Sequence, residues 1–171
     1  MTIRSKEELE QILKEVDQAD YSVADIKKGE RIKKAPVPFT TSTLQQEASK
    51  ALNFATSKTM RIAQQLYEGI DIKGNGTVGI ITYLRTDSTR VSEEADASVR
   101  EYIASNYGKE YVAAGEAKAG ADKKIIQDAH EAIRPTDVSR TPAAMKDSLT
   151  RDQFRLYQLI WKRFVASRMR P

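Results

Sequence analysis

A tyrosine at the end of a run of strand-forming residues is the side chain in this sequence best suited to covalent chemistry. Tyr83 lies in the segment ITYLRTDST, and Arg85 follows two positions later. Side chains two apart on an extended chain share a face, so we expect Tyr83 and Arg85 to point at the same volume. If that volume holds a phosphodiester, the tyrosine oxygen is a usable nucleophile once its proton leaves. Arg85 would favour that loss and neutralise charge on the phosphoryl oxygens.

A phosphotyrosine ester is also easily reversed, because a phenolate is a good leaving group. A deoxyribose hydroxyl that attacks the phosphorus would release the tyrosine and restore the strand. The alternative is that Tyr83 is half-buried packing with an exposed hydroxyl, which is common at strand ends, and spacing alone leaves both interpretations open. Asp87 and Ser88 suit a turn in either case.

The single histidine is a second candidate. His130 lies in DAHEAIRPT, four residues before Arg134. The segment predicts a short helical turn that ends at Pro135, and positions four apart on such a turn are neighbours. His130 and Arg134 would then both face a phosphate. A surface histidine with a companion arginine is the alternative on the same spacing.

The elements that would position these residues are predicted to be mostly helical. Apolar periodicity and capping residues predict helices over about 5–19, 42–52, 58–67, 92–108 and 151–169. Ser42 with Gln45 and Thr150 with Gln153 match the capping-box pattern. The apolar run from Val78 to Leu84 predicts a continuous buried strand. The Ala-, Gly- and Lys-rich residues 112–126 predict a surface loop.

A boundary is predicted near residue 35. YSVADI is short and rich in β-formers, and KKGERIKK suits a turn between extended segments. Pro36 and Pro38 follow, and both bias the preceding residue to extended geometry. We therefore expect a first segment over 1–35, with a helix and short strands, and a separate domain over 36–171.

Composition narrows the classes of partner and site. The net charge of +4 and a pI of about 9.2 favour a polyanionic partner, although 24 acidic residues offset most of the 28 basic ones. The absence of Cys excludes disulfides and, with one His, argues against structural zinc. We find no secretion signal, no membrane span, no Walker-type phosphate loop and no clustered carboxylates for magnesium. A cytoplasmic protein is expected, with no metal ligands of its own.

Basic residues recur along the last predicted helix. They are Arg151, Arg155, Lys162, Arg163, Arg168 and Arg170. Such a set predicts either a DNA-facing side or the solvated face of an amphipathic helix.

Four segments together resemble type IA DNA topoisomerases, most of all the bacterial enzymes. They are PFTTSTLQQEASKALNFATSKTMRIAQQLYEG, GIITYLRTDSTRVS, DAHEAIRPTDV and LYQLIWKRFVASRM. They occur in the family's order over roughly residues 36–170, and the match extends more loosely to the start. Leu84 replaces a methionine typical of the family, which is a conservative change.

The resemblance implies a role for each matching position. Tyr83 is similar to the nucleophile that becomes linked to a 5′ phosphate of single-stranded DNA. Arg85 is similar to the arginine that contacts DNA near the scissile phosphate, and His130 to a histidine near that phosphate. Thr86, Asp87 and Arg134 lie in the same motifs and are expected to bind DNA.

The resemblance also implies a fold and a missing partner. The family's tyrosine domain is mainly α with a few short strands and a helix-turn-helix-like arrangement, and residues 1–35 resemble a small α/β stub of the arch domain. Family members are far longer, and an N-terminal domain holds Mg²⁺ through Glu and Asp residues. The parent enzyme would relax negative supercoils without ATP in the bacterial cytoplasm, at the nucleoid, and this chain alone would be inactive. The alternative function is a non-catalytic helical DNA-binding or interaction module on the same scaffold.

Overall fold

The computed structural model describes residues 3–114 and 130–171, and the chain divides into two units between Ile32 and Lys33. The assignment of residues 1–35 and 36–171 to two family domains stays a prediction. Among the described residues, every helix is too short or too polar to cross a lipid bilayer.

The first unit contains one helix, α1 (Lys6–Asp17), which confirms the helix expected over 5–19. Ser5 caps it, because its hydroxyl accepts a hydrogen bond from the Glu8 N–H at 3.2 Å. Residues 19–38 form neither helix nor strand, so the short strands expected there are wrong. A strand needs a hydrogen-bonding partner strand, and within 3–114 and 130–171 none pairs with these residues, most of which are exposed.

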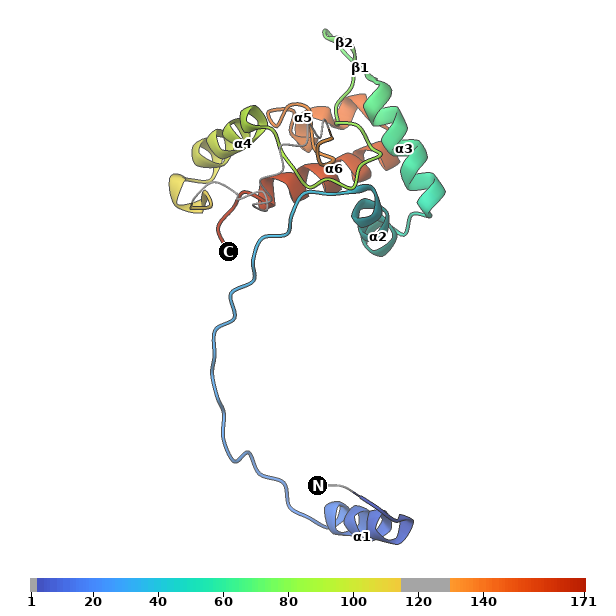
Figure 1. The fold of residues 1–171 in the computed structure, drawn as a ribbon, viewed down its shortest axis with the longest axis vertical. Helices are drawn as coiled ribbons and strands as arrows, with labels where there is room; N and C mark the ends of the chain where they lie inside the picture. The colour runs from blue at the N-terminus through green and yellow to red at the C-terminus, as the bar shows by residue number, and fades with distance from the viewer. Residues whose placement is uncertain (1–2, 115–129) are drawn as a thin grey trace. The chain divides into compact units, whose positions relative to one another are not determined.

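The second unit is mainly helical, as expected (Figure 1). Its elements in chain order are α2 (Thr41–Leu52), α3 (Thr56–Glu68), β1 (Ile70–Ile72), β2 (Gly76–Val78), α4 (Glu93–Asn106), the 3₁₀ turn η1 (Lys109–Tyr111), α5 (Pro142–Met145), the 3₁₀ turn η2 (Lys146–Ser148) and α6 (Arg151–Ala166). The helices expected over 58–67, 92–108 and 151–169 are formed as α3, α4 and α6. Most of the loop expected over 112–126 lies outside the described residues.

Helix α6 supplies the centre of the core and crosses the unit between α4 on one side and α2 and α3 on the other (Figure 1). Its buried face is apolar, and two of its rings also carry polar atoms. The Trp161 indole N–H donates to the Val138 carbonyl at 3.0 Å, and the Tyr157 hydroxyl donates to the Arg140 carbonyl at 2.6 Å. The segment that precedes α5 is therefore held on α6 by buried, satisfied hydrogen bonds.

The basic residues of α6 do not form one free face. The guanidinium of Arg163 lies 4.4 Å from the centre of the Phe39 ring, and that of Arg155 lies 5.2 Å from the Phe54 ring. Arg168, just beyond the helix, is only 7% exposed. Several of these cations therefore cover or join parts of the core, which removes them from a continuous DNA-facing side.

The start of α2 differs from the sequence expectation. Thr40 and Thr43 form the capping box, so Ser42 with Gln45 is the wrong pair by two residues. Thr40 is the last extended residue, with φ −93° and ψ 172°, and its side chain can therefore reach the first free N–H groups. The helix ends at Asn53, which adopts the left-handed conformation at φ 58°.

The continuous strand expected over Val78–Leu84 is not formed. Strand β2 ends at Val78, which pairs with Ile70 in an antiparallel hairpin with β1. Beyond it Ile80, Ile81 and Leu84 are buried, and among the described residues the one ladder contact of this run is an isolated bridge between Ile81 and Pro135. The apolar pattern predicts the burial of these three residues correctly, but Tyr83 is exposed, and the continuous strand is wrong because the segment forms single hydrogen bonds to several neighbours.

A partly buried ion cluster joins α4 to the chain just beyond α6. Asp96 accepts hydrogen bonds from Arg100 and from Arg168, each at 2.5 Å. Burial alone would raise the pKa of Asp96, but hydrogen bonds and charge from the two arginines outweigh it and hold the pKa below its ordinary value of 3.8.

We expect Asp96→Asn to lower the free energy of unfolding by about 1–3 kcal/mol at neutral pH, because it leaves two arginines without their carboxylate. Folding lowers this pKa, so the contribution is fully present above 3.8 and is lost as the pH falls through the lower folded value. Urea denaturation at several pH values should show the difference from wild type shrinking below that pH. Asp147→Asn, at an exposed position, is the control, and equal effects of the two variants would contradict the prediction.

Candidate functional site

Residues 80–86, which we call the site segment, run between three other parts of the unit. The Ile80 N–H donates to the Leu66 carbonyl at the end of α3 at 2.9 Å. The Thr136 N–H donates to the Ile80 carbonyl at 3.0 Å. Two threonines hold the rest of the segment by hydrogen bonds: Thr82 before Tyr83, and Thr41 of α2 after it.

Thr82 joins the site segment to residues 130–136, which we call the proline segment. Its N–H donates to the Arg134 carbonyl at 2.9 Å. Its hydroxyl accepts from the Arg134 N–H at 3.0 Å and donates to the Ala132 carbonyl at 2.7 Å. The backbone immediately before Tyr83 is thus fixed by three hydrogen bonds across 50 or more residues of sequence.

Thr41, the first residue of α2, repeats this pattern on the other side of Tyr83. Its N–H donates to the Thr86 carbonyl at 2.9 Å, and its hydroxyl accepts from the Thr86 N–H at 2.9 Å. The same hydroxyl lies 2.7 Å from the Leu84 carbonyl, to which it donates. The peptide groups on both sides of Arg85 are therefore held by the helix start.

The side chains of the site segment alternate between core and solvent. Leu84 and Thr86 are buried, at 1% and 8% exposure, whereas Tyr83 is 46% exposed and Arg85 and Asp87 are also exposed. Tyr83 and Arg85 are thus both exposed, and the expectation that they share a side stays a prediction. Thr86 was expected to bind DNA, but its side chain is buried. Its hydroxyl accepts a hydrogen bond from the Ser88 N–H at 3.0 Å and closes a turn.

Tyr67, on the last turn of α3, packs against Tyr83. The two ring centres are 5.3 Å apart with an angle of 64° between the planes, which is an edge-to-face contact. Helix α3 reaches this position because Gly79 lets it approach. A Cβ atom at Gly79 would lie 2.5 Å from the Tyr67 carbonyl oxygen. The Tyr83 ring is therefore supported on one side and open to solvent elsewhere.

The proline segment is extended, so the helical turn predicted for it is wrong over the described residues 130–135. Its hydrogen bonds explain the difference. The Ile133 N–H donates to the Phe39 carbonyl at 2.8 Å, and the Ala132 N–H donates to the Arg90 carbonyl at 2.8 Å. These bonds to distant carbonyls replace those a helix would make within itself.

His130 and Arg134 are consequently not neighbours on one helical turn. His130 is exposed and precedes Ala132, the residue that bonds Thr82, so its segment runs alongside that of Tyr83. The Arg134 side chain is mostly buried instead. It forms an ion pair with Glu131 at 2.5 Å and donates to the carbonyl of Pro135 at 3.0 Å.

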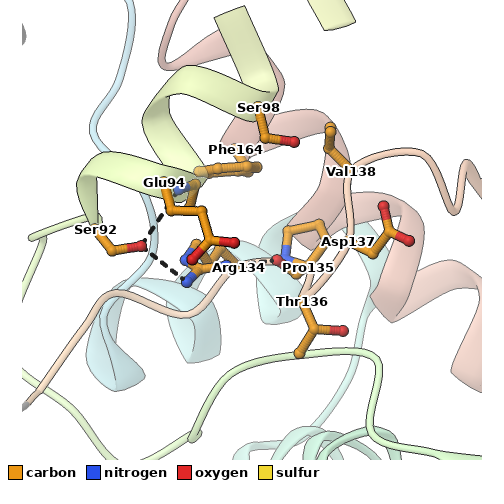
Figure 2. Close-up of a pocket in the computed structure, with 10 residues that line it drawn as sticks. Ser92, Glu94, Ser98, Arg134, Pro135, Thr136, Asp137, Val138 and Phe164 are labelled. Atoms are coloured by element: carbon orange, nitrogen blue, oxygen red, sulfur yellow. Dashed lines mark hydrogen bonds between the residues drawn. The ribbon is translucent and has the colours of Figure 1, made fainter. Parts of the chain in front are cut away.

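Arg134 also lines a cavity of about 300 Å³ at the start of α4. Figure 2 shows the Arg134 guanidinium hydrogen-bonded to the Ser92 hydroxyl at 3.5 Å, with Glu94, Thr136 and Asp137 also lining the cavity. The wall mixes carboxylates with the arginine and hydroxyls, so it has no single charge to select an ion. Tyr83 and Arg85 do not line this cavity, and the candidate nucleophile lies on an open surface.

The described residues do not form a metal centre. Within 3–114 and 130–171, His, Asp and Glu side chains do not gather in any group of three that could hold a metal ion. Asp87 is the one carboxylate among the expected site residues, and a single carboxylate is too few ligands for Mg²⁺.

Known proteins resemble this chain in sequence and in fold. A family model described as DNA topoisomerase matches residues 1–171. The structure of full-length topoisomerase I from Thermotoga maritima, in a monoclinic crystal form, is 48% identical with a TM-score of 0.78. The match covers 94% of this chain and 25% of that one, so the chain spans about a quarter of the length of this relative. The chain therefore belongs to the bacterial type IA DNA topoisomerase family.

Three residues that shape the site were not predicted from the sequence. Thr41 looks like part of a helix cap, Thr82 like an ordinary strand residue, and Tyr67 like the inner face of a helix. The one signal that could have found Thr82 is its place directly before the candidate nucleophile. Nothing local indicates Thr41, because its partners are 43 and 45 residues away.

We expect Gly79→Ala to destabilise the second unit by about 1–3 kcal/mol, because the new methyl group meets backbone that cannot move without separating α3 from the site segment. The distance of 2.5 Å from Cβ to the Tyr67 carbonyl oxygen leaves no room for it. The midpoint of urea denaturation measures the loss. Gly29→Ala, with nothing within 4 Å, should leave it unchanged. An unchanged midpoint for Gly79→Ala would contradict the packing described.

Proposed function

We propose that this chain is the tyrosine-bearing part of an enzyme that cuts and reseals one strand of DNA. The observation that carries the proposal is the presentation of Tyr83. Its ring is half exposed, the nearby Arg85 is exposed as well, and the backbone of their segment is held on both sides of Tyr83. A nucleophile fixed in this way loses little entropy when it meets its target.

The chemistry is an exchange of two phosphodiester bonds. The Tyr83 oxygen attacks the phosphorus and loses its proton, while the bond from phosphorus to the 3′ oxygen breaks and that oxygen gains a proton. The product is a 5′-phosphotyrosyl link and a free 3′ hydroxyl. Attack by this hydroxyl reverses the reaction. The ester conserves the energy of the broken bond, so resealing needs no ATP.

Arg85 is proposed to contact the phosphoryl oxygens and stabilise the charge that develops there. His130 is proposed to lie near the same phosphate and Asp87 to bind the strand beside it, whereas the buried Thr86, also expected to bind DNA, shapes the turn after Arg85. The part of Arg134 is more indirect. Its guanidinium is engaged by Glu131 and by the Pro135 carbonyl, so it holds the proline segment in shape beneath the DNA.

The Mg²⁺ ion of such an enzyme does not fit the residues described here, and we derive no step through it. We propose that carboxylates of another domain of the parent protein hold it and close over the open surface at Tyr83. The chain alone should therefore bind single-stranded DNA weakly and in a salt-dependent way, without relaxing negatively supercoiled DNA. The parent enzyme would act on the chromosome, in the bacterial cytoplasm.

The test is a covalent adduct. The chain is combined with the magnesium-binding domain of a type IA topoisomerase, Mg²⁺ and a labelled single-stranded oligonucleotide, and the mixture is separated under denaturing conditions. We expect a labelled protein band that is lost completely in Tyr83→Phe, because phenylalanine has no oxygen to form the ester.

Tyr111→Phe is the matched control, since Tyr111 is 49% exposed and Tyr83 is 46% exposed. It should keep the adduct. A well-folded pair of domains that binds the oligonucleotide but yields no adduct would overturn the proposal in favour of a non-catalytic DNA-binding module.

A further inference from the structure

We propose that Thr41 is a positioning residue for Arg85, acting from the first turn of α2. The inference deepens the proposed function, on which it rests. It assigns to the helix start a part in aligning the cation that meets the phosphate, beyond its part in beginning a helix.

The backbone around Arg85 is fixed almost entirely by this one residue. Thr41 accepts the Thr86 N–H at 2.9 Å, donates to the Leu84 carbonyl at 2.7 Å and gives its own N–H to the Thr86 carbonyl at 2.9 Å. The buried side chains of Leu84 and Thr86 anchor the same stretch from below. Both peptide groups that flank Arg85 thus have one orientation.

The Arg85 side chain has no comparable restraint of its own. It is exposed, and among the described residues it makes no ion pair or hydrogen bond. The direction in which it leaves the chain is therefore set by the backbone alone. A change that frees the neighbouring peptide groups would let the guanidinium sample directions that miss the phosphate.

Thr41 is itself held rigidly enough for this task. The capping box of Thr40 and Thr43 fixes the helix start around it. The preceding Phe39 is fully buried and forms a bridge to Ile133 of the proline segment. A β-branched side chain on a helix has few rotamers, so the hydroxyl stays directed at the site segment.

The test compares the rate of chemistry with the affinity for DNA. In the chain combined with the magnesium-binding domain, we measure the single-turnover rate of adduct formation on a single-stranded oligonucleotide, and its affinity by fluorescence anisotropy. Thr41→Val keeps the shape but removes the hydroxyl. We expect adduct formation to slow by about 10- to 100-fold with little change in affinity. Thr41→Ser, which keeps the hydroxyl, should restore most of the rate.

Thr59→Val is the matched control, because this fully buried hydroxyl bonds the Ala55 carbonyl within α3 and does not touch the site segment. It should leave the rate unchanged. An equal rate for Thr41→Val and wild type, or an equal loss in Thr59→Val, would overturn the positioning role while leaving the proposed function intact. Absence of any adduct in the wild type would overturn the proposed function and this inference together.

Discussion

The site depends on the hydrogen bonds made by backbone N–H and C=O groups that are buried but belong to neither a helix nor a strand. Such groups cost free energy unless they find partners. Here three extended stretches meet, the one entering α2, the site segment and the proline segment, and they exchange hydrogen bonds. Thr41 and Thr82 make this possible, because each hydroxyl accepts one N–H and donates to one carbonyl that no backbone group reaches. The arrangement that satisfies these groups also presents Tyr83.

Local chemistry was enough to predict the helices of the second unit. Ser92 and Thr150 cap α4 and α6 as the sequence indicates, and the apolar stripes face the core. The wrong predictions concern segments whose structure is set by hydrogen-bond partners far away in the sequence. The segment around Ile133 has the composition of a helical turn, but the Ile133 N–H donates to the Phe39 carbonyl instead. The run after Val78 has the composition of a strand, but in the described part of the chain no strand pairs with it.

The number of basic residues likewise does not predict what each of them contacts. The net charge of +4 favours a nucleic-acid partner, yet individual cations serve other ends. Arg163 lies over the Phe39 ring, Arg168 is bound to Asp96, and Arg134 is bound to Glu131. Arg85 stands apart from these three because its side chain is exposed beside Tyr83. The contacts of each cation therefore indicate its function better than the number of cations in the sequence.

The central claim is that Tyr83 is presented by a rigid arrangement that exists before DNA or another domain binds. Native-state hydrogen exchange of the free chain tests it directly, at the amides of Thr82, Thr86 and Arg134. The account predicts that these three amides exchange only with global unfolding, at the rate of the buried amides of α6. Exchange as fast as that of the exposed Asp87 amide would contradict it, because the site would then form only on binding.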